Sequence, residues 1–144
     1  MLNLATLLEN SAHKYADKAA FTFMDTILSF SQVNRAANQV ANALVDLGIE
    51  PGDKVAMSCF NLPYFPIIYN GILRAGAIVV PLSVLLKSDE IQFHLEDSDA
   101  KAYFCFVGTE DLPMGKMGHE GFQKAKNCAN FIMIMPKEDM PSPI

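Results

Sequence analysis

The stretch Gly115-Lys-Met-Gly118 is the first place where residue types suggest chemistry, because glycine and lysine together can bind phosphate. A P-loop requires glycine, four further residues and then Gly-Lys-Ser/Thr, so that backbone amides hold the phosphates and the hydroxyl holds magnesium. Here position 110 is glutamate and Met117 has no hydroxyl, so the pattern fails at both ends. The same glycines, with Gly121, also miss Gly-x-Gly-x-x-Gly. We therefore predict a flexible surface loop over Gly108 to Gly118.

The histidines do not form a metal-binding or catalytic set. His119-Glu120 is followed by Gln123 where a zinc-protease helix carries its second histidine, so that pattern fails. His13 and His94 lie far away in the sequence, and a packed or half-exposed structural role is favoured for His94. No serine lies in a Gly-x-Ser-x-Gly motif.

Acidic side chains gather at Glu96, Asp97 and Asp99, where a helix is expected to end. Paired carboxylates can act as general acid and base. A solvated helix terminus explains the same residues without chemistry, and we favour that interpretation. We therefore assign no catalytic, cofactor-binding or metal-binding residue to this chain.

A group of apolar residues has two interpretations, the lining of an acyl tunnel or part of the hydrophobic core. Aromatic and aliphatic residues at helical spacing usually belong to the core, which we favour. The group consists of Phe60, Leu62, Tyr64, Phe65, Ile68 and Tyr69.

The composition indicates one globular domain. Of 144 residues, 51% are hydrophobic and 19% charged, which argues against disorder, and the net charge of −5 argues against nucleic-acid binding. The longest apolar stretch, from Leu62 to Leu86, is interrupted by prolines and Arg74, so we expect no transmembrane segment. The N-terminus lacks the basic region of a secretory signal, and we expect a cytoplasmic protein.

The cysteines are three in number and contain no Cys-x-x-Cys pair. Buried, reduced thiols are the favoured interpretation of Cys59, Cys105 and Cys128, and a thiol redox protein is an alternative.

The first third of the chain predicts a helix, a hairpin and a second helix. Asn3 is placed to cap a helix ending near Ala16, and strands at 20–24 and 27–30 flank a turn at Asp25-Thr26. Ser29 and Gln32 match a capping box, with Leu28 and Val33 as a hydrophobic staple, for a helix reaching Leu47. Gly48 can then adopt the left-handed conformation of a Schellman motif.

The remainder alternates between short apolar strands and helices. The expected strands are 54–60, 77–80, 102–107 and 131–135, and the expected helices are 61–75, from Ser88 onward, and a weak one at 120–126. Unbroken apolar strands are typical of parallel βαβ units. We therefore predict an α/β fold in which an N-terminal helix and β-hairpin precede parallel βαβ units, with helices on both sheet faces. One subdomain over 1–135 is expected, followed by a Pro-rich, linker-like end at 136–144.

Four landmarks in order carry a resemblance to a known family. They are Gly48-Ile-Glu-Pro-Gly-Asp-Lys-Val55, Asn61, the segment from Gly76 to Pro81, and Asp97-Ser-Asp-Ala-Lys101. Each is modest alone, but their order and spacing resemble the N-terminal portion of the adenylate-forming acyl-CoA synthetases, most closely the bacterial long-chain fatty-acid–CoA ligases. The resemblance implies the N-terminal subdomain of that fold.

The resemblance also implies an activity for the whole protein. Such enzymes join ATP to a carboxylate, release pyrophosphate, and transfer the acyl group to coenzyme A with help from Mg²⁺. Their phosphate loop, ribose-binding aspartate and catalytic lysine normally follow this region, so we expect a truncated portion that is inactive alone and carries no cofactor. Expected partners are the remainder of the synthetase and a second copy, with peripheral membrane contact of the whole enzyme. Alternatives are a ligase for another carboxylate and a non-catalytic binding or dimerisation module.

Overall fold

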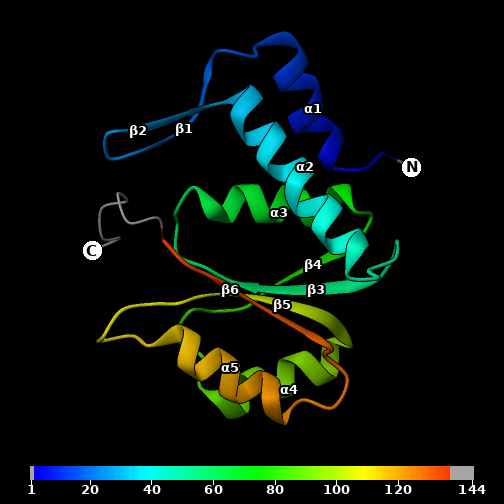
Figure 1. Ribbon diagram of the computed structural model, residues 1–144, viewed down its shortest axis with the longest axis vertical. Coiled ribbons are helices and arrows are strands. Elements are labelled where there is room, and N and C mark those ends of the chain that lie inside the picture. Colours follow the sequence, from blue (N-terminus) through cyan, green and yellow to red (C-terminus); the bar gives the residue numbers. More distant parts are fainter. Residues whose placement is uncertain (1, 137–144) are drawn as a thin grey trace. The chain divides into compact units, whose positions relative to one another are not determined.

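The computed structural model describes residues 2–136, and it divides them into two compact units (Figure 1). The first unit contains the residues up to Gly52 together with Asn61–Ile78. The second contains Asp53–Phe60 and the residues from Val79 onward. The predicted end segment at 137–144 lies outside the described residues.

The first unit is built from three helices and a hairpin: α1 (Ala5–Lys14), β1 (Ala19–Phe23), β2 (Thr26–Ser29), α2 (Phe30–Asp46) and α3 (Tyr64–Arg74). Strands β1 and β2 pair antiparallel. Leu8, Val33 and Ala37 form a buried cluster, and Leu28, the other residue of the predicted staple, packs against this cluster.

Helix α2 has the ends that its sequence predicts. The Ser29 Oγ accepts a hydrogen bond from the Gln32 N–H (3.2 Å), and the Gln32 Oε1 accepts one from the Ser29 N–H (2.8 Å), which completes the capping box. At the other end Gly48 has φ +83°, and the N–H groups of Gly48 and Ile49 donate to the carbonyls of Val45 and Leu44. These two bonds are those of a Schellman motif.

A second Schellman motif ends α3. The connection that follows it is hydrogen-bonded to the connection that follows α2. Gly76 has φ +79°, and the N–H groups of Gly76 and Ala77 donate to Leu73 and Ile72. The Gly52 N–H in turn donates to the Gly76 carbonyl at 2.9 Å. A β-carbon on Gly76 would lie only 3.1 Å from the Pro51 Cβ, so this close approach and the positive φ angle both favour glycine at position 76.

Three boundaries in the first unit differ from prediction. The hairpin turn is Met24-Asp25, one residue earlier than predicted, with Met24 at φ +49°. Helix α1 begins at Ala5, although the Asn3 Oδ1 still accepts from the Ala5 N–H at 2.9 Å. Helix α3 begins at Tyr64 and not at Asn61. This start places Pro66 in the first helical turn, where its missing N–H costs no hydrogen bond.

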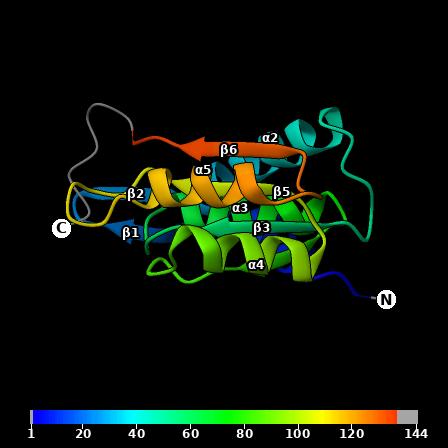
Figure 2. The ribbon, with the colours of Figure 1, turned by 90° about the horizontal axis from the view of Figure 1, so that it is seen from below.

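The second unit is centred on a sheet with the order β4-β3-β5-β6. The strands are β3 (Lys54–Ser58), β4 (Ile78–Pro81), β5 (Ala100–Phe106) and β6 (Asn130–Ile134), and the β3–β5 and β5–β6 pairs are parallel. Val55, Ala56 and Met57 are buried in succession, as their unbroken apolar run predicts. Helices α4 (Ser88–Ser98) and α5 (Met114–Lys124) lie side by side on this sheet (Figure 2). The predicted mixed α/β fold with parallel βαβ units is confirmed.

The predicted surface loop at Gly108 to Gly118 is wrong beyond its first residues, because α5 already begins at Met114. Its glycines are buried and face close neighbours. A β-carbon on Gly118 would lie 2.6 Å from the Cys105 Sγ, and one on Gly121 would lie 2.7 Å from the Ser88 carbonyl oxygen. Close approach to a strand and to a neighbouring helix therefore outweighs the low helix propensity of glycine.

Helix α4 begins as predicted to within one residue. Lys87 precedes it, Ser88 is its first residue, and the Lys87 N–H donates to the Glu90 Oε2 at 2.8 Å. Ile91 and Leu95 are buried, as predicted. Between residues 2 and 136 the structure has no helix that is long and apolar enough to cross a membrane.

Candidate functional site

An apolar cleft lies in the first unit. It lies beside strand β1 and the segment that leads into α3, and its volume is about 260 Å³. The hydrophobic lining residues are Phe21, Phe23, Leu62, Pro63, Phe65 and Pro66. Thr22 and Asn61 are its polar lining residues, and Asn61 is exposed.

The apolar residues that suggested a tunnel or a core lie in different places in the structure. Leu62 and Phe65 line the cleft. Ile68 is buried in α3, and the Tyr69 ring stacks on Phe65 with 6.0 Å between centroids. Phe60 belongs to the second unit, where its ring meets Phe106 edge-on at 5.6 Å. No sequence pattern points to Phe21 and Phe23, because their contribution depends on the hairpin lying beside the start of α3.

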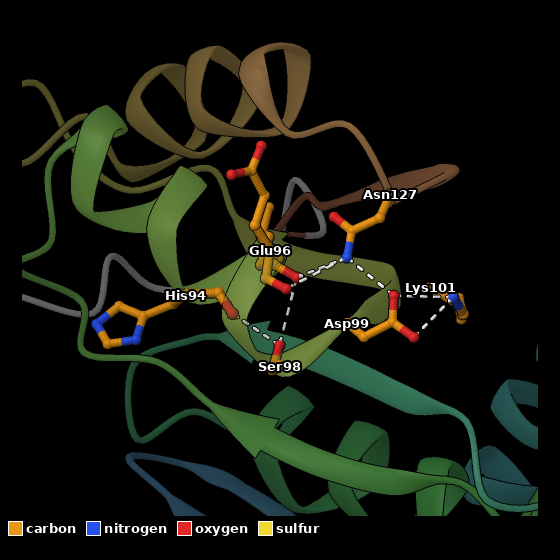
Figure 3. Close-up of polar contacts among 7 residues, drawn as sticks. His94, Glu96, Ser98, Asp99, Lys101 and Asn127 are labelled. Carbon is orange, nitrogen blue, oxygen red and sulfur yellow. Dashed lines mark hydrogen bonds and ion pairs between the residues drawn. The ribbon is translucent and has the colours of Figure 1, made fainter.

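Glu96 and Asp99, near the end of α4, belong to one cluster of polar contacts, and Asp97 is exposed (Figure 3). Asp99 has φ +56° and ends the helix in the left-handed conformation. Its Oδ1 accepts hydrogen bonds from the Asn127 Nδ2 and the Lys101 Nζ, both at 3.0 Å. The same Asn127 amide donates to the carbonyls of Leu95 and Glu96 at 3.4 Å. The landmark Asp97-Ser-Asp-Ala-Lys101 therefore ends a helix and starts β5.

The electrostatics of this cluster agree with a capping role. The hydrogen bonds from Asn127 and Lys101 lower the pKa of Asp99, which keeps its carboxylate ionised and accepting. The Glu96 Oε1 accepts from the Lys126 N–H at 3.3 Å. His94 contributes only its carbonyl, which accepts from the Ser98 Oγ at 2.7 Å. The Glu96 carboxylate thus holds a backbone N–H, and the Asp99 carboxylate holds the side chains of Asn127 and Lys101.

Arg74 is a second polar centre, in the first unit. Its guanidinium donates to the Asn34 carbonyl (3.2 Å) and Oδ1 (2.8 Å) and to the Asn38 Oδ1 (2.7 Å), and its Nε lies 3.3 Å from the Glu9 carboxylate. The side chain is only 11% exposed. Arg74 therefore links α3 to α2 and α1. Its positive charge is paired with the Glu9 carboxylate.

The predicted burial of the cysteines is confirmed, and all three are free thiols. Burial raises the pKa of the Cys59 thiol to about 12 and those of Cys105 and Cys128 to about 11. Thiols of this kind hold very little thiolate near neutral pH, so the redox alternative has no support in the structure.

The remaining histidines and acids do not converge. His13 and His119 are exposed, and the His119 ring packs near Phe131 at 5.3 Å. Across residues 2–136, no three histidine, cysteine, aspartate or glutamate side chains are grouped so that they could hold a metal ion. We derive no chemical step through a metal or a nucleotide.

Comparisons with known proteins identify the family. The AMP-binding enzyme family matches residues 8–142. The chain is 38% identical over 161 aligned positions to the long-chain-fatty-acid–CoA ligase of Salmonella typhimurium, covering 99% of this chain and 29% of that protein. It is 36% identical over 100 positions to the oxalate–CoA ligase of Arabidopsis thaliana, covering 68% of this chain and 20% of that protein.

Solved structures give the same result. The anthranilate–CoA ligase AuaEII, crystallised with anthranoyl-AMP, superposes with a TM-score of 0.78 and 28% identity, covering 92% of this chain and 25% of that chain. This chain thus spans under a third of the length of these relatives. The match over nearly all of its residues, together with the βαβ fold, shows that the chain belongs to the AMP-binding enzyme family.

Proposed function

We propose that the chain is the N-terminal portion of a long-chain fatty-acid–CoA ligase. The observation that carries the proposal is the 38% identity to the Salmonella typhimurium enzyme over 99% of this chain. The whole ligase would use ATP, Mg²⁺ and coenzyme A to convert a fatty acid into its acyl-CoA in the cytoplasm, with peripheral membrane contact during substrate uptake.

The role proposed for this portion is to form a scaffold and not to perform the chemistry. Two polar centres of the described residues, at Arg74 and Asp99, hold helices and turns together. Stabilising the charge that develops on a transferred phosphate requires several donors aimed at one point. We therefore expect no adenylation by the chain alone.

Fatty-acid-dependent exchange of pyrophosphate into ATP tests both statements. The chain alone should give no exchange above a no-protein control. A chimera that joins residues 1–136 to the remainder of the Salmonella typhimurium ligase should exchange with hexadecanoate and not with oxalate. Exchange by the chain alone would contradict the scaffold role.

A ligase for another carboxylate is a second candidate, which the Arabidopsis thaliana relative makes specific. Pyrophosphate exchange by the whole ligase that carries this chain, with hexadecanoate and with oxalate, separates the two candidates. A folded chimera that exchanges with no acid would favour a non-catalytic binding module. Cooperative unfolding of the chimera in urea serves as the control for folding.

The proposed partners are the remainder of the synthetase and a second copy of the chain. Strand β6 ends the described sheet and has a strand neighbour on one side only. Met133 and Met135 are exposed at this end of the chain. An unprotected edge strand favours pairing with another strand. Light scattering over a concentration series should show a dimer, and a strictly monomeric chain would contradict this proposal.

A further inference from the structure

A polar hollow lies between helices α1 and α2, which lie side by side in the first unit (Figure 1). Its volume is about 300 Å³, which is roughly the space of ten water molecules. The residues that line it are Glu9, Ala12 and His13 from α1 and Ser31, Asn34 and Arg35 from α2. All of them belong to the first unit, so the geometry of the hollow depends on that unit alone.

The lining residues of α2 present hydrogen-bond donors from one face of the helix. Ser31, Asn34 and Arg35 have the spacing i, i+3 and i+4, which places them beside one another. Within residues 2–136, the Arg35 guanidinium and the Ser31 hydroxyl form no hydrogen bond or ion pair. Both groups are therefore available to a ligand.

Asn34 adds a donor whose orientation is fixed by Arg74. The Asn34 Oδ1 accepts from the Arg74 Nη2 at 2.8 Å, and the Asn34 carbonyl accepts from the Arg74 Nη1 at 3.2 Å. A guanidinium can only donate, so the Nδ2 group must occupy the other side of the Asn34 amide. Nδ2 has no acceptor in the part of the chain that the structure describes, which leaves its N–H groups for a ligand.

The charge around the hollow is positive. Glu9 is part of the lining, but its carboxylate lies 3.3 Å from the Arg74 Nε, and these two charges offset each other. Arg35 has no such countercharge among the described residues, although the chain as a whole carries −5. Glu9 and His13 are residue types that bind metals, but Arg35 beside them would repel a cation. The hollow therefore favours an anion.

The number of donors distinguishes between classes of anion. A guanidinium binds a carboxylate through two parallel hydrogen bonds, which occupy both carboxylate oxygens. The Asn34 amide and the Ser31 hydroxyl would then have no oxygen of their own to bind. A phosphate monoester has three terminal oxygens and a charge of about −2, so it can accept from all three side chains at once.

We propose that the hollow between α1 and α2 binds the phosphate group of a small phosphate monoester. Arg35 pairs with two of the phosphate oxygens, and Asn34 and Ser31 donate to the third. The rest of the volume accommodates the organic part of the ligand, beside Ala12 and His13 of α1. That organic part belongs either to a soluble molecule or to a lipid, and separate probes distinguish these two sources.

Titration of the isotope-labelled chain with glycerol phosphate, followed by nuclear magnetic resonance, tests the soluble source. The amide signals of α1 and of the first two turns of α2 should shift and saturate. Acetate and glycerol at the same ionic strength should bind at least tenfold more weakly, because neither offers three charged oxygens. Equal affinity for acetate would overturn the proposal.

Flotation of the chain with phosphatidylcholine vesicles, with and without phosphatidic acid, tests the lipid source. Phosphatidic acid carries the same phosphate monoester on a lipid. Binding of glycerol phosphate without flotation would support a soluble ligand, and flotation only with phosphatidic acid would support a lipid headgroup. If a chain that unfolds cooperatively in urea binds neither probe, the proposal is wrong.

Two isosteric variants locate the site. Asn34→Asp keeps the oxygen that accepts from Arg74 and replaces the Nδ2 donor with an anionic oxygen, so it should weaken binding at least tenfold. Asn38→Asp is the matched control, because the Asn38 Oδ1 also accepts from Arg74, at 2.7 Å, but lies outside the lining of the hollow. Its added charge is screened by water and salt and should weaken binding by less than about threefold. Equal losses in the two variants would overturn the proposal.

A second pair of variants separates the site from the net charge. Arg35→Gln should weaken binding at least tenfold, because the bidentate partner of the phosphate is lost. Lys116→Gln removes the same charge from an exposed position of α5, in the second unit, and should bind as the unmodified chain does. Equal losses would show that binding depends on net charge alone. Urea midpoints of all the variants serve as the control for folding.

The outcome is independent of the exchange assay, because these titrations contain neither ATP nor a fatty acid. An inactive chimera would leave the phosphate site standing. A chain that binds no phosphate monoester would leave the proposed ligase function standing.

Discussion

Helices α2 and α5 are held in place in opposite ways. Helix α2 carries its own start and stop signals, a capping box at Ser29 and a Schellman motif at Gly48. Helix α5 has no side-chain cap at its start, and buried glycines occupy its packed face. The position of α2 is determined mainly by its local sequence, and the position of α5 by the surface on which it packs. Each can therefore be destabilised by a different kind of substitution.

The largest effect should come from Leu44→Ala in α2. Leu44 is fully buried, so the substitution leaves a cavity and should lower the free energy of unfolding by about 2–5 kcal/mol. Urea unfolding measures the change. Val45→Ala, next in the sequence and 58% exposed, is the control and should change stability by less than about 0.5 kcal/mol. Equal effects would mean that the buried stripe of α2 is misplaced.

Gly118→Ala in α5 should lower stability by about 1–3 kcal/mol, because the new methyl group would lie 2.6 Å from the Cys105 Sγ. At an exposed helical position the same substitution would raise stability by about 1 kcal/mol. A lower urea midpoint would therefore confirm the close packing of Gly118, and a higher midpoint would contradict it. Lys116→Ala, at an exposed position of the same helix, is the control.

Ser29→Ala should cost about 0.5–2 kcal/mol, because the Gln32 N–H loses its acceptor. The double variant with Gln32→Ala should cost less than the sum of the two single variants, since both hydrogen bonds belong to one capping box. Strict additivity in urea unfolding would show that the two bonds act independently. Gln39→Ala, exposed on the same helix, controls for helix propensity.

The smallest effect should be a loss of stability at alkaline pH that is caused by the Cys105 thiol, which is buried beneath α5. Burial raises the pKa of Cys105 from 9.0 to about 11, so the unfolded chain releases this proton first. Stability from this thiol is complete below pH 9.0 and is lost as the pH rises towards about 11. Urea midpoints at pH 8 and pH 10 should differ less in Cys105→Ala than in the unmodified chain. An unchanged difference would assign the loss to other groups.

The same contrast explains which parts of the fold the sequence could predict. Caps, staples and Schellman glycines act over a few neighbouring residues, so α2 was predicted almost to the residue. The packing of Gly118 on Cys105 joins positions distant in the sequence, and no local pattern reports it. For this reason α5 was predicted as a loop followed by a weak helix.

The candidate cleft shows the same limit. Leu62 and Phe65 could be proposed from their apolar character, but the contribution of Phe21 and Phe23 depends on where the hairpin lies. The start of α3 was misjudged because Asn61 is a good cap residue, while Pro66 restricts the helix to a later start. The capping role of Asn127 was not predicted, since it lies 28 residues from Asp99.

The crossing at Gly52 and Gly76 has a consequence for rearranging this chain. The Gly52 N–H donates to the Gly76 carbonyl, so the connections that leave α2 and α3 are joined by a backbone hydrogen bond. New termini or inserted residues placed at either connection should prevent both helices from ending correctly. The exposed Met24-Asp25 turn has no such tie to a second connection among the described residues, which makes it the preferred point for circular permutation or for inserting a reporter domain.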